Sequence, residues 1–282
     1  MTPPRLGEET ASAHWGWDEH RYFGHRVFAE LTGSESLAGL MALSITGRRL
    51  PADLVGVLDD AAAALTLADP RIWPLKLTRV VASYGSMIPA LCAGLLMEDE
   101  ARIGPWAFLE AAKVLVEIHR ELDGSLEPGR VRAAVEAHIR KHQFVWGFGT
   151  PFRPKDERLV AFKSCIERRG KQSLPYFRTM EAMADAVREL RHAEPNIGIA
   201  LAATLLDMGL SPAQVGALVV ALMQHMFFAH AVEGAAAERS LLRELPAEYV
   251  TYRGREARLS PLAARERAAN GESTSKTKTA AE

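Results

Sequence analysis

Apolar residues recur along most of this chain at intervals of three and four positions, the spacing of one helix face. The clearest case is residues 128–142, where Val131, Val135 and Ile139 form a stripe. The same pattern predicts further helices over 37–43, after 51, over 75–81 and 87–97, from 106, and over 177–192, 197–210 and 215–228. Convincing strand alternation is absent, and 248–252 is the one weak candidate. The pattern therefore predicts an all-α fold.

Residues with capping chemistry mark several of these helix ends. Side-chain oxygens of Ser, Thr and Asn accept hydrogen bonds from the free N–H groups of a first turn, and glycine ends a helix easily. Capping boxes are expected where Glu or Gln follows three residues after such a cap. The predicted caps and closing residues are Thr32 with Glu35, Gly47, Asn196, and Ser211 with Gln214.

The composition describes an ordinary folded protein. Of 282 residues, 48% are hydrophobic and 24% charged, and the net charge of -1 excludes nucleic-acid binding by bulk charge. Changes in composition predict a large helical domain over 13–127 and 194–262 and a small helical domain over 128–193. Residues 1–12 and 263–282 are expected to be disordered.

Targeting signals and disulfides are not expected. The N-terminus lacks the apolar stretch of a signal peptide, and a break at 207–212 keeps the apolar runs on either side below the roughly 18 residues that span a bilayer. The two cysteines, Cys92 and Cys165, lie in helical stretches. These features predict a cytoplasmic protein without membrane contact.

A glycine-containing loop, Gly147–Thr150, precedes a basic stretch. Between 150 and 171 there are seven bases against three acids. Glycines expose backbone N–H groups and bases neutralise phosphate, so the segment suits a phosphorylated ligand. The alternative is a solvated turn beside a charged helix face, which composition alone favours.

The histidines indicate less. His138 and His142 stand four apart on one helix face, but no acid follows in the pattern of a zinc protease, so no metal site is predicted. His225 and His230 stand five apart and do not share a face. They are interpreted as core or subunit-contact histidines, each with a backbone or side-chain partner.

Four motifs in order resemble those of citrate synthases and the shorter citryl-CoA lyase-like proteins. They are Gly147-Phe148-Gly149 followed by Asp156-Glu157-Arg158, then Pro195-Asn196-Ile197-Gly198, Ala229-His230-Ala231-Val232-Glu233, and Pro246 through Tyr252-Arg253-Gly254. The resemblance covers roughly residues 35–258. It implies a helical two-domain dimer that holds acyl-CoA in its smaller domain and makes or breaks a C–C bond between the domains. The residues it assigns to the CoA ligand are Gly147, Phe148, Gly149, Arg153, Lys155 and Arg158.

The catalytic positions of that family are changed here. The resemblance implies two histidines and an aspartate that removes a proton from acyl-CoA, and their positions carry Ile103, Thr150 and Gly198. Neither glycine nor isoleucine can act as a base, and threonine cannot become a cation. An arginine that grips a carboxylate is replaced by Met223, whereas Arg158 matches the family.

Two hypotheses of function follow. The changed residues favour a non-catalytic relative that binds CoA or acyl-CoA without a metal, or that serves as a partner subunit. The alternative is an active acyl-CoA transferase or lyase that uses Thr150, Arg158 and His225 in new roles. Under either hypothesis a homodimer is expected, and a hetero-oligomer with an active paralogue is the other assembly considered.

Overall fold

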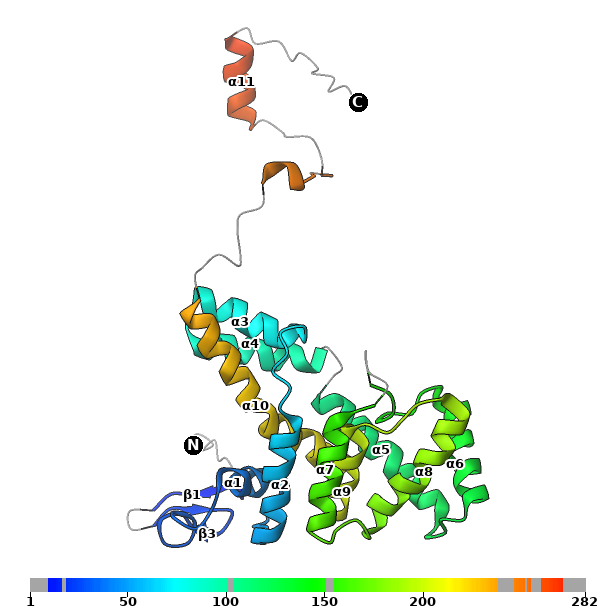
Figure 1. The fold of residues 1–282 in the computed structure, drawn as a ribbon. Helices are drawn as coiled ribbons and strands as arrows, with labels where there is room; N and C mark the ends of the chain where they lie inside the picture. The colour runs from blue at the N-terminus through cyan, green and yellow to red at the C-terminus, as the bar shows by residue number, and fades with distance from the viewer. Residues whose placement is uncertain are drawn as a thin grey trace, which may run out of the picture. The chain divides into compact units, whose positions relative to one another are not determined.

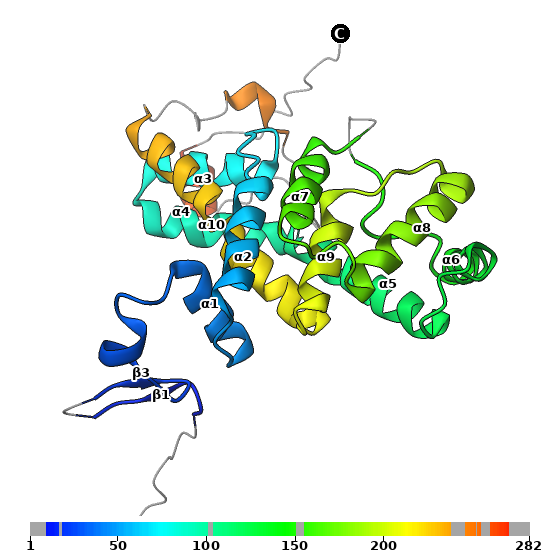
Figure 2. The same cartoon turned by 60° about the horizontal axis from the view of Figure 1, so that its bottom comes forward.

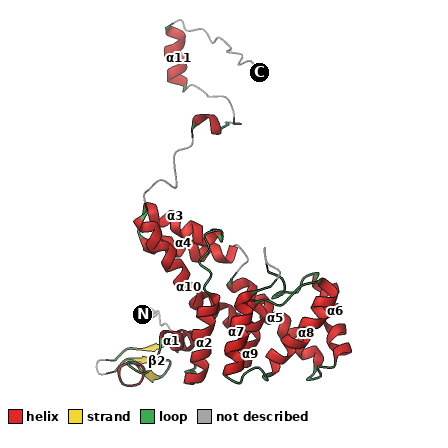
Figure 3. Ribbon diagram, in the orientation of Figure 1, coloured by secondary structure: helices red, strands yellow, loops and turns green. Residues whose placement is uncertain are grey.

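The computed structural model describes residues 10–16, 19–100, 104–150, 155–237, 246–251, 253–254 and 260–270. The chain divides into two units, Met1–Leu241 and Leu242–Glu282. Helices account for most of the described chain (Figure 3), which confirms the all-α prediction. Ile103 and Arg153, two positions that the sequence singles out, lie outside the described residues.

The first unit contains ten α-helices among its described residues (Figure 1). They are α1 (Leu37–Thr46), α2 (Ala52–Leu65), α3 (Trp73–Tyr84), α4 (Met87–Glu100), α5 (Pro105–Leu122), α6 (Pro128–His142), α7 (Glu157–Arg168), α8 (Pro175–Arg191), α9 (Ile197–Asp207) and α10 (Pro212–Ala236). All but α7 start or end near predicted positions. Helix α7 lies inside the basic stretch, where the charges obscure the helical spacing of its buried Leu159, Phe162 and Ile166.

Two of the predicted caps are confirmed and one is wrong. Asn196 Oδ1 accepts from Gly198 N at 2.8 Å, and Ser211 forms the predicted capping box with Gln214. Helix α1, however, begins after Ser36 and not after the predicted Thr32. Thr32 instead ends a π-helical turn, Val27–Leu31, whose carbonyl at Val27 accepts from the Thr32 hydroxyl at 2.9 Å.

Three two-residue strands precede this turn, and the sequence pattern did not predict them. They are β1 (Ala13–His14), β2 (Arg21–Tyr22) and β3 (His25–Arg26), joined as one antiparallel sheet. Strands of two residues are too short to show alternation. The weak strand candidate over 248–252 is not a strand at its start, because Ala247–Tyr249 forms a 3-10 turn.

A continuous apolar core joins α1, α2 and α5 through α10. Helix α9 lies at its centre and packs against α5, α7, α8 and α10 (Figure 2). Every residue of α9 from Ile197 to Leu206 is buried. The expectation that this all-round apolar segment needs burial on every side is therefore confirmed. Helices α6 and α8, from the predicted small domain, share this core with α5 and α9, and the domain boundaries remain a prediction.

Helix α10 continues from the core to the α3–α4 pair (Figure 1). It runs to Ala236, beyond the predicted end at 228, because the small and apolar residues there still pack on α3 and α4. By length and composition α10 is one helix that could cross a membrane, and half of its apolar window is buried in the protein. A buried core helix has the same properties.

The second unit holds α11 (Pro261–Ala269). Residues 263–269 of this helix lie in the stretch that was expected to be disordered. Ser260 caps the helix by accepting from Ala263 N at 3.1 Å, and Pro261 occupies the first turn. A cap, a first-turn proline and an alanine-rich sequence are together sufficient to favour the helix. Residues 271–282 and 1–9 lie outside the described residues.

Candidate functional site

Hydrogen bonds hold the glycine loop, Gly147–Thr150, against the segment that leads into α9. Gly149 N donates to the carbonyl of Glu194 at 2.7 Å, and Asn196 N donates to the carbonyl of Gly147 at 2.9 Å. The Asn196 side-chain amide then donates to the carbonyl of Gly149 at 2.7 Å. Two of the motifs that the sequence singles out, 147–149 and 195–198, are thereby brought together. These hydrogen bonds make the loop a rigid part of the body.

At two positions of this contact a Cβ atom would lie too close to a neighbouring atom, so glycine is favoured there. Gly147 has φ +89°, and a Cβ there would lie 2.5 Å from Ile199 Cβ. A Cβ on Gly198 would lie 2.8 Å from Asn196 Oδ1, the atom that caps α9. The resemblance places a catalytic aspartate at position 198. The Asn196 cap of α9 favours a glycine at that position. A side chain at 198 would have to displace the Asn196 oxygen.

Of the other two positions that the resemblance singles out, Thr150 lies in the described chain and Ile103 does not. Thr150 is half-buried and directly follows Gly149. Helix α5 begins after Gly104, and its Trp106 packs edge-to-face on Trp146 with ring centroids 4.7 Å apart. Because Trp146 precedes Gly147, this contact brings the start of α5 to the glycine loop. None of these three positions carries an imidazole or a carboxylate.

Asp156 was not predicted as a site residue, and it is the buried charge of this region. Its carboxylate is 1% exposed and accepts from Arg158 Nε at 2.8 Å and from Ile197 N, at the start of α9, at 3.0 Å. Burial opposes the charged form, yet the guanidinium and the backbone donors together hold the pKa of Asp156 below its ordinary value. The signal in the sequence was its place just before α7, where it is the N-cap. Arg158, predicted to contact ligand, thus already has a carboxylate partner.

Three bases of the 150–171 stretch pair with acids from other elements. Lys163 contacts Glu181 of α8, and two further bases reach back to α2. The closest N–O distances are 2.6 Å for Lys163–Glu181, 2.7 Å for Arg169–Asp60 and 2.9 Å for Lys171–Asp53. The structure therefore supports the alternative in which the basic run is a neutralised protein surface.

Lys155 differs from these bases. It is exposed, and among the described residues no ion pair engages it. It lines a hollow of about 320 Å³ with side chains of both signs. The charged residues of this hollow are Lys155, Asp156, Lys163, Glu181, Asp185, Arg188 and Glu194. Of the predicted phosphate-binding bases that the structure describes, Lys155 is the one that remains available to a ligand.

His225 does not join this site through any hydrogen bond of the described residues. Its Nδ1 lies 3.0 Å from the carbonyl of Leu222, and its Nε2 lies 2.8 Å from the Thr66 hydroxyl at the end of α2. Both ring nitrogens therefore have local partners, as expected, but His225 is exposed and is not a core residue in the single chain. His230 Nε2 similarly contacts the carbonyl of Ala68 at 3.0 Å, although its Nδ1 is buried without a hydrogen-bond partner in the described protein.

Glu98, near the end of α4, is a buried acid that the sequence analysis missed. It is 5% exposed, and among the described residues its carboxylate has no hydrogen bond or ion pair. Burial raises its pKa from 4.5 to about 7. A Cβ on Gly104 would lie 2.6 Å from Glu98 Oε1, so the acid sits beside the start of α5. In the sequence it is hidden in an acidic run that looks solvent-facing.

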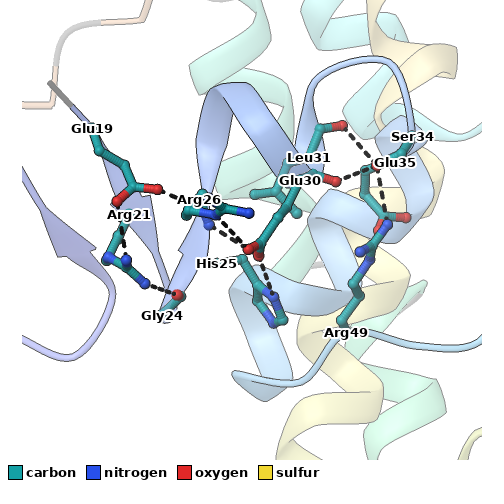
Figure 4. Close-up of polar contacts among 10 residues, drawn as sticks. All are labelled: Glu19, Arg21, Gly24, His25, Arg26, Glu30, Leu31, Ser34, Glu35 and Arg49. Atoms are coloured by element: carbon teal, nitrogen blue, oxygen red, sulfur yellow. Dashed lines mark hydrogen bonds and ion pairs between the residues drawn. The ribbon is translucent and has the colours of Figure 1, made fainter.

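A second hollow, of about 670 Å³, lies between the N-terminal strands and α1. Its wall is mainly apolar and includes Trp15, Leu37 and Met41. Ion pairs hold the strands beside it (Figure 4): Arg26 contacts both Glu19 and Glu30, and Arg49 contacts Glu35 on the approach to α1. This hollow contains none of the residues that the sequence motifs single out.

Comparison with known proteins defines the class of fold. No family model matches the chain, and no curated protein matches it. Among solved structures, citryl-CoA lyase from Hydrogenobacter thermophilus is similar with a TM-score of 0.75 and 18% identity, over 93% of this chain and 100% of that chain. An ATP citrate lyase mutant from Methanosaeta concilii in complex with (3S)-citryl-CoA is similar with a TM-score of 0.70 and 16% identity, over 94% of this chain and 44% of that chain.

Citrate synthase from Thermoplasma acidophilum, in a ternary complex with carboxymethyl coenzyme A and oxaloacetate, is similar with a TM-score of 0.59 and 18% identity. That match covers 82% of this chain and 61% of the synthase chain. The chain therefore has a fold like that of citryl-CoA lyase and citrate synthase, as the sequence motifs implied. Its length is that of the whole citryl-CoA lyase and less than half of the ATP citrate lyase chain.

Proposed function

We propose that this protein binds CoA or an acyl-CoA at the glycine loop and does not carry out ordinary citrate synthesis or citryl-CoA cleavage. The observation that carries the proposal is the loop itself. Hydrogen bonds to Glu194 and Asn196 hold it in place, while the adjoining positions 150 and 198 have no catalytic side chain. Structural neighbours in complex with citryl-CoA, or with citrate and coenzyme A, support a ligand of the CoA type.

The chemistry of the remaining groups supports the absence of citrate turnover. Deprotonation of an acyl-CoA methyl needs a base, and Gly198 offers none. Stabilisation of the enolate or of the ketone oxygen needs a strong donor, and Thr150 is a neutral one. The Arg158 guanidinium is already paired with Asp156. A dicarboxylate placed there would find much less uncompensated positive charge than the family pattern supplies.

The binding half of the proposal is tested by calorimetric titration with CoA and acetyl-CoA at two salt concentrations. Lys155→Ala, alone or with Arg153→Ala, should weaken binding by on the order of ten-fold, because a charged phosphate contact contributes about 1.5–3 kcal/mol. Lys171→Ala is the matched control, since Lys171 pairs with Asp53 on α2. Absence of heat from the wild-type protein at millimolar CoA would contradict the proposal.

The catalytic half is tested with acetyl-CoA and oxaloacetate. We expect no measurable release of CoA from the wild-type protein. A turnover near one per second, the low end for ordinary enzymes, would overturn the non-catalytic interpretation.

Glu98 favours the second candidate function, an active acyl-CoA lyase or transferase with altered residues. A buried carboxylate whose pKa is about 7 suits a general base at neutral pH, and Glu98 lies beside the segment that leads from 103 into α5. Exchange of acetyl-CoA methyl protons in D2O, followed by NMR, would reveal such a base. The exchange should be lost in Glu98→Gln and kept in Glu110→Gln, where the acid is partnered by Lys113.

We infer that the protein forms a homodimer through α4 and α10. Ile88 and Leu96 are 72% and 66% exposed and lie eight residues apart on one face of α4, with exposed Cys92 between them. Phe228 and Val232 add a similar exposed pair on α10. Apolar stripes of this kind on adjacent helices favour burial against a second subunit.

Light scattering at micromolar concentration tests this assembly, with the double variant Ile88→Lys and Leu96→Lys predicted to give monomers. A wild-type monomer would contradict the homodimer and would favour a hetero-oligomer with an active paralogue. A cytoplasmic location remains part of the proposal, supported by the two free cysteines.

A further inference from the structure

Helices α5 and α6 bring a carboxylate and two imidazoles together outside the glycine-loop site. Glu117 Oε2 lies 3.0 Å from His138 Nδ1 and 3.7 Å from His142 Nε2. These three atoms all lie within 4.8 Å of one another. Nothing in the chemistry proposed for the CoA ligand uses this cluster.

The arrangement follows from the helix period. Residues four apart share a helix face, so His138 and His142 lie on the same side of α6, with ring centroids 4.5 Å apart. Helix α5 packs along that side and supplies the third group from Glu117. Lys141 approaches the other carboxylate oxygen, Oε1, at 3.2 Å. Oε2 is therefore the oxygen that faces both imidazoles.

The three side chains are of the kinds that bind transition metals. The His138 side chain is 5% exposed and lies against Glu117, so its ring is shielded from solvent. A metal ion takes histidine as the neutral ring and glutamate as the carboxylate.

His138 gives a second observation. Its Nε2 is buried and has no hydrogen-bond partner in the described protein. If Nε2 carries the ring proton, Nδ1 turns its lone pair toward Glu117 Oε2, and two acceptors then face each other. A cation between them removes that conflict, whereas the opposite tautomer leaves Nε2 as a buried acceptor without a donor.

We propose that Glu117, His138 and His142 bind a divalent transition metal ion of the Zn²⁺ type, with the remaining position open to water. Two histidines and one glutamate form a known zinc donor set. Metal–ligand bonds of about 2.0–2.1 Å place tetrahedral ligand atoms roughly 3.3–3.4 Å apart. The two distances to Glu117 Oε2, 3.0 and 3.7 Å, lie on either side of that value. Small side-chain rotations would therefore complete the site.

The site would act as a clamp on the path into the glycine loop. His142 is the last residue of α6, and Gln143 then turns the chain with φ +61° toward Gly147. A metal ion that joins the end of α6 to α5 would fix the start of this segment. The metal site does not depend on whether the loop binds CoA, so the two proposals fail or succeed separately.

The test uses the full, untagged chain freed of metal and titrated with Zn²⁺ in a calorimeter, with Co²⁺ absorption as a second readout. We expect one site per chain and a higher melting temperature with Zn²⁺. His142→Ala and Glu117→Gln should weaken Zn²⁺ binding by on the order of ten-fold or more. His14→Ala and Glu136→Gln are the matched controls, because both residues are exposed and lie outside the cluster.

Lys141→Ala sharpens the test. Lys141 forms an ion pair with Glu117. Removal of the Lys141 charge should therefore tighten Zn²⁺ binding if the metal binds the same carboxylate. No Zn²⁺ binding by the wild-type chain at 100-fold excess, or equal binding by wild type and His142→Ala, would overturn the proposal. In either of those cases the cluster is an ion-pair network between α5 and α6.

Discussion

The body around α5 and α9 and the outer α3–α4 pair are both helical, yet they are held together in different ways. In the body, one continuous core runs through eight helices and includes fully buried Leu115 and Phe162. The outer pair packs on the far part of α10 through two small clusters. These are Leu75 with Met226 and Phe227, and Ala82 with Ala90 and Ala231.

This difference indicates that the body is fully packed within one chain, whereas the outer α3–α4 pair leaves apolar side chains for a partner to cover. The body buries α9 on all sides and holds the glycine loop against the start of that helix by hydrogen bonds. The outer pair buries little of α4 and leaves an apolar stripe at Ile88 and Leu96. Because stability scales with buried apolar area, the outer pair should open more easily than the body unless a second subunit covers it.

Asp156→Ala should give one of the two largest losses, about 3–5 kcal/mol of unfolding free energy, because it leaves the Arg158 charge and the Ile197 N–H without their shared acceptor. Chemical denaturation followed by circular dichroism measures it. Asp156→Asn, which keeps the shape, should lose less. An Asp156→Ala protein as stable as wild type would show that the site is not anchored to the body through this charge.

A pair of equal truncations compares the two regions directly. Leu115→Ala in the body should cost about 3–5 kcal/mol of global stability, since the cavity is enclosed. Leu75→Ala removes the same atoms from the small outer cluster, and there we expect about 2 kcal/mol, seen mainly as faster amide exchange in α3 and α4. Equal costs, with exchange unchanged in α3 and α4, would break the distinction between the regions.

Glu98 lies where the two regions meet, and it should make stability depend on pH. Its pKa in the folded protein, about 7, lies above the ordinary 4.5, so the native state binds more protons between these values. The contribution of this group to stability should therefore be fully present below pH 4.5 and fall by about 2–3 kcal/mol as pH rises from there through 7. Glu98→Gln should remove this fall, and denaturation at pH 5 and pH 8 measures it. A variant with the wild-type pH slope would contradict the burial of this acid.

The smallest effect is expected from the pair of Lys163 and Glu181 on the surface of the body. Both side chains are partly exposed, at 33% and 46%, so Lys163→Ala should cost about 0.2–1 kcal/mol. A double-mutant cycle with Glu181→Ala isolates the pair. A coupling above about 2 kcal/mol would mean that charge pairs, and not only the apolar core, hold α7 to α8.

Much of the fold could be predicted because helix period and capping are local properties. The stripe Val131, Val135 and Ile139 predicted α6 at its observed bounds, and Asn196 and Ser211 cap the helices that they were expected to cap. The motifs at 147–149 and 195–198 also indicated the fold and lie together in it. Helix α7 was missed because its charged residues obscure the spacing of its apolar ones. The strands were missed because two residues are too few to show alternation, and the cap of α1 because Thr32 belongs to the preceding turn.

The sequence by itself therefore determined where most helices lie and which of the positions that resemble the citrate synthase pattern carry no base. Only the tertiary structure decided which charges are neutralised, since Arg169 and Lys171 find their acids on α2, more than one hundred residues away. The same holds for Glu98, whose pKa depends on burial, and for Glu117, which α5 brings to His138 and His142. Electrostatic interaction depends on distance and on solvent in three dimensions, and a one-dimensional pattern records neither.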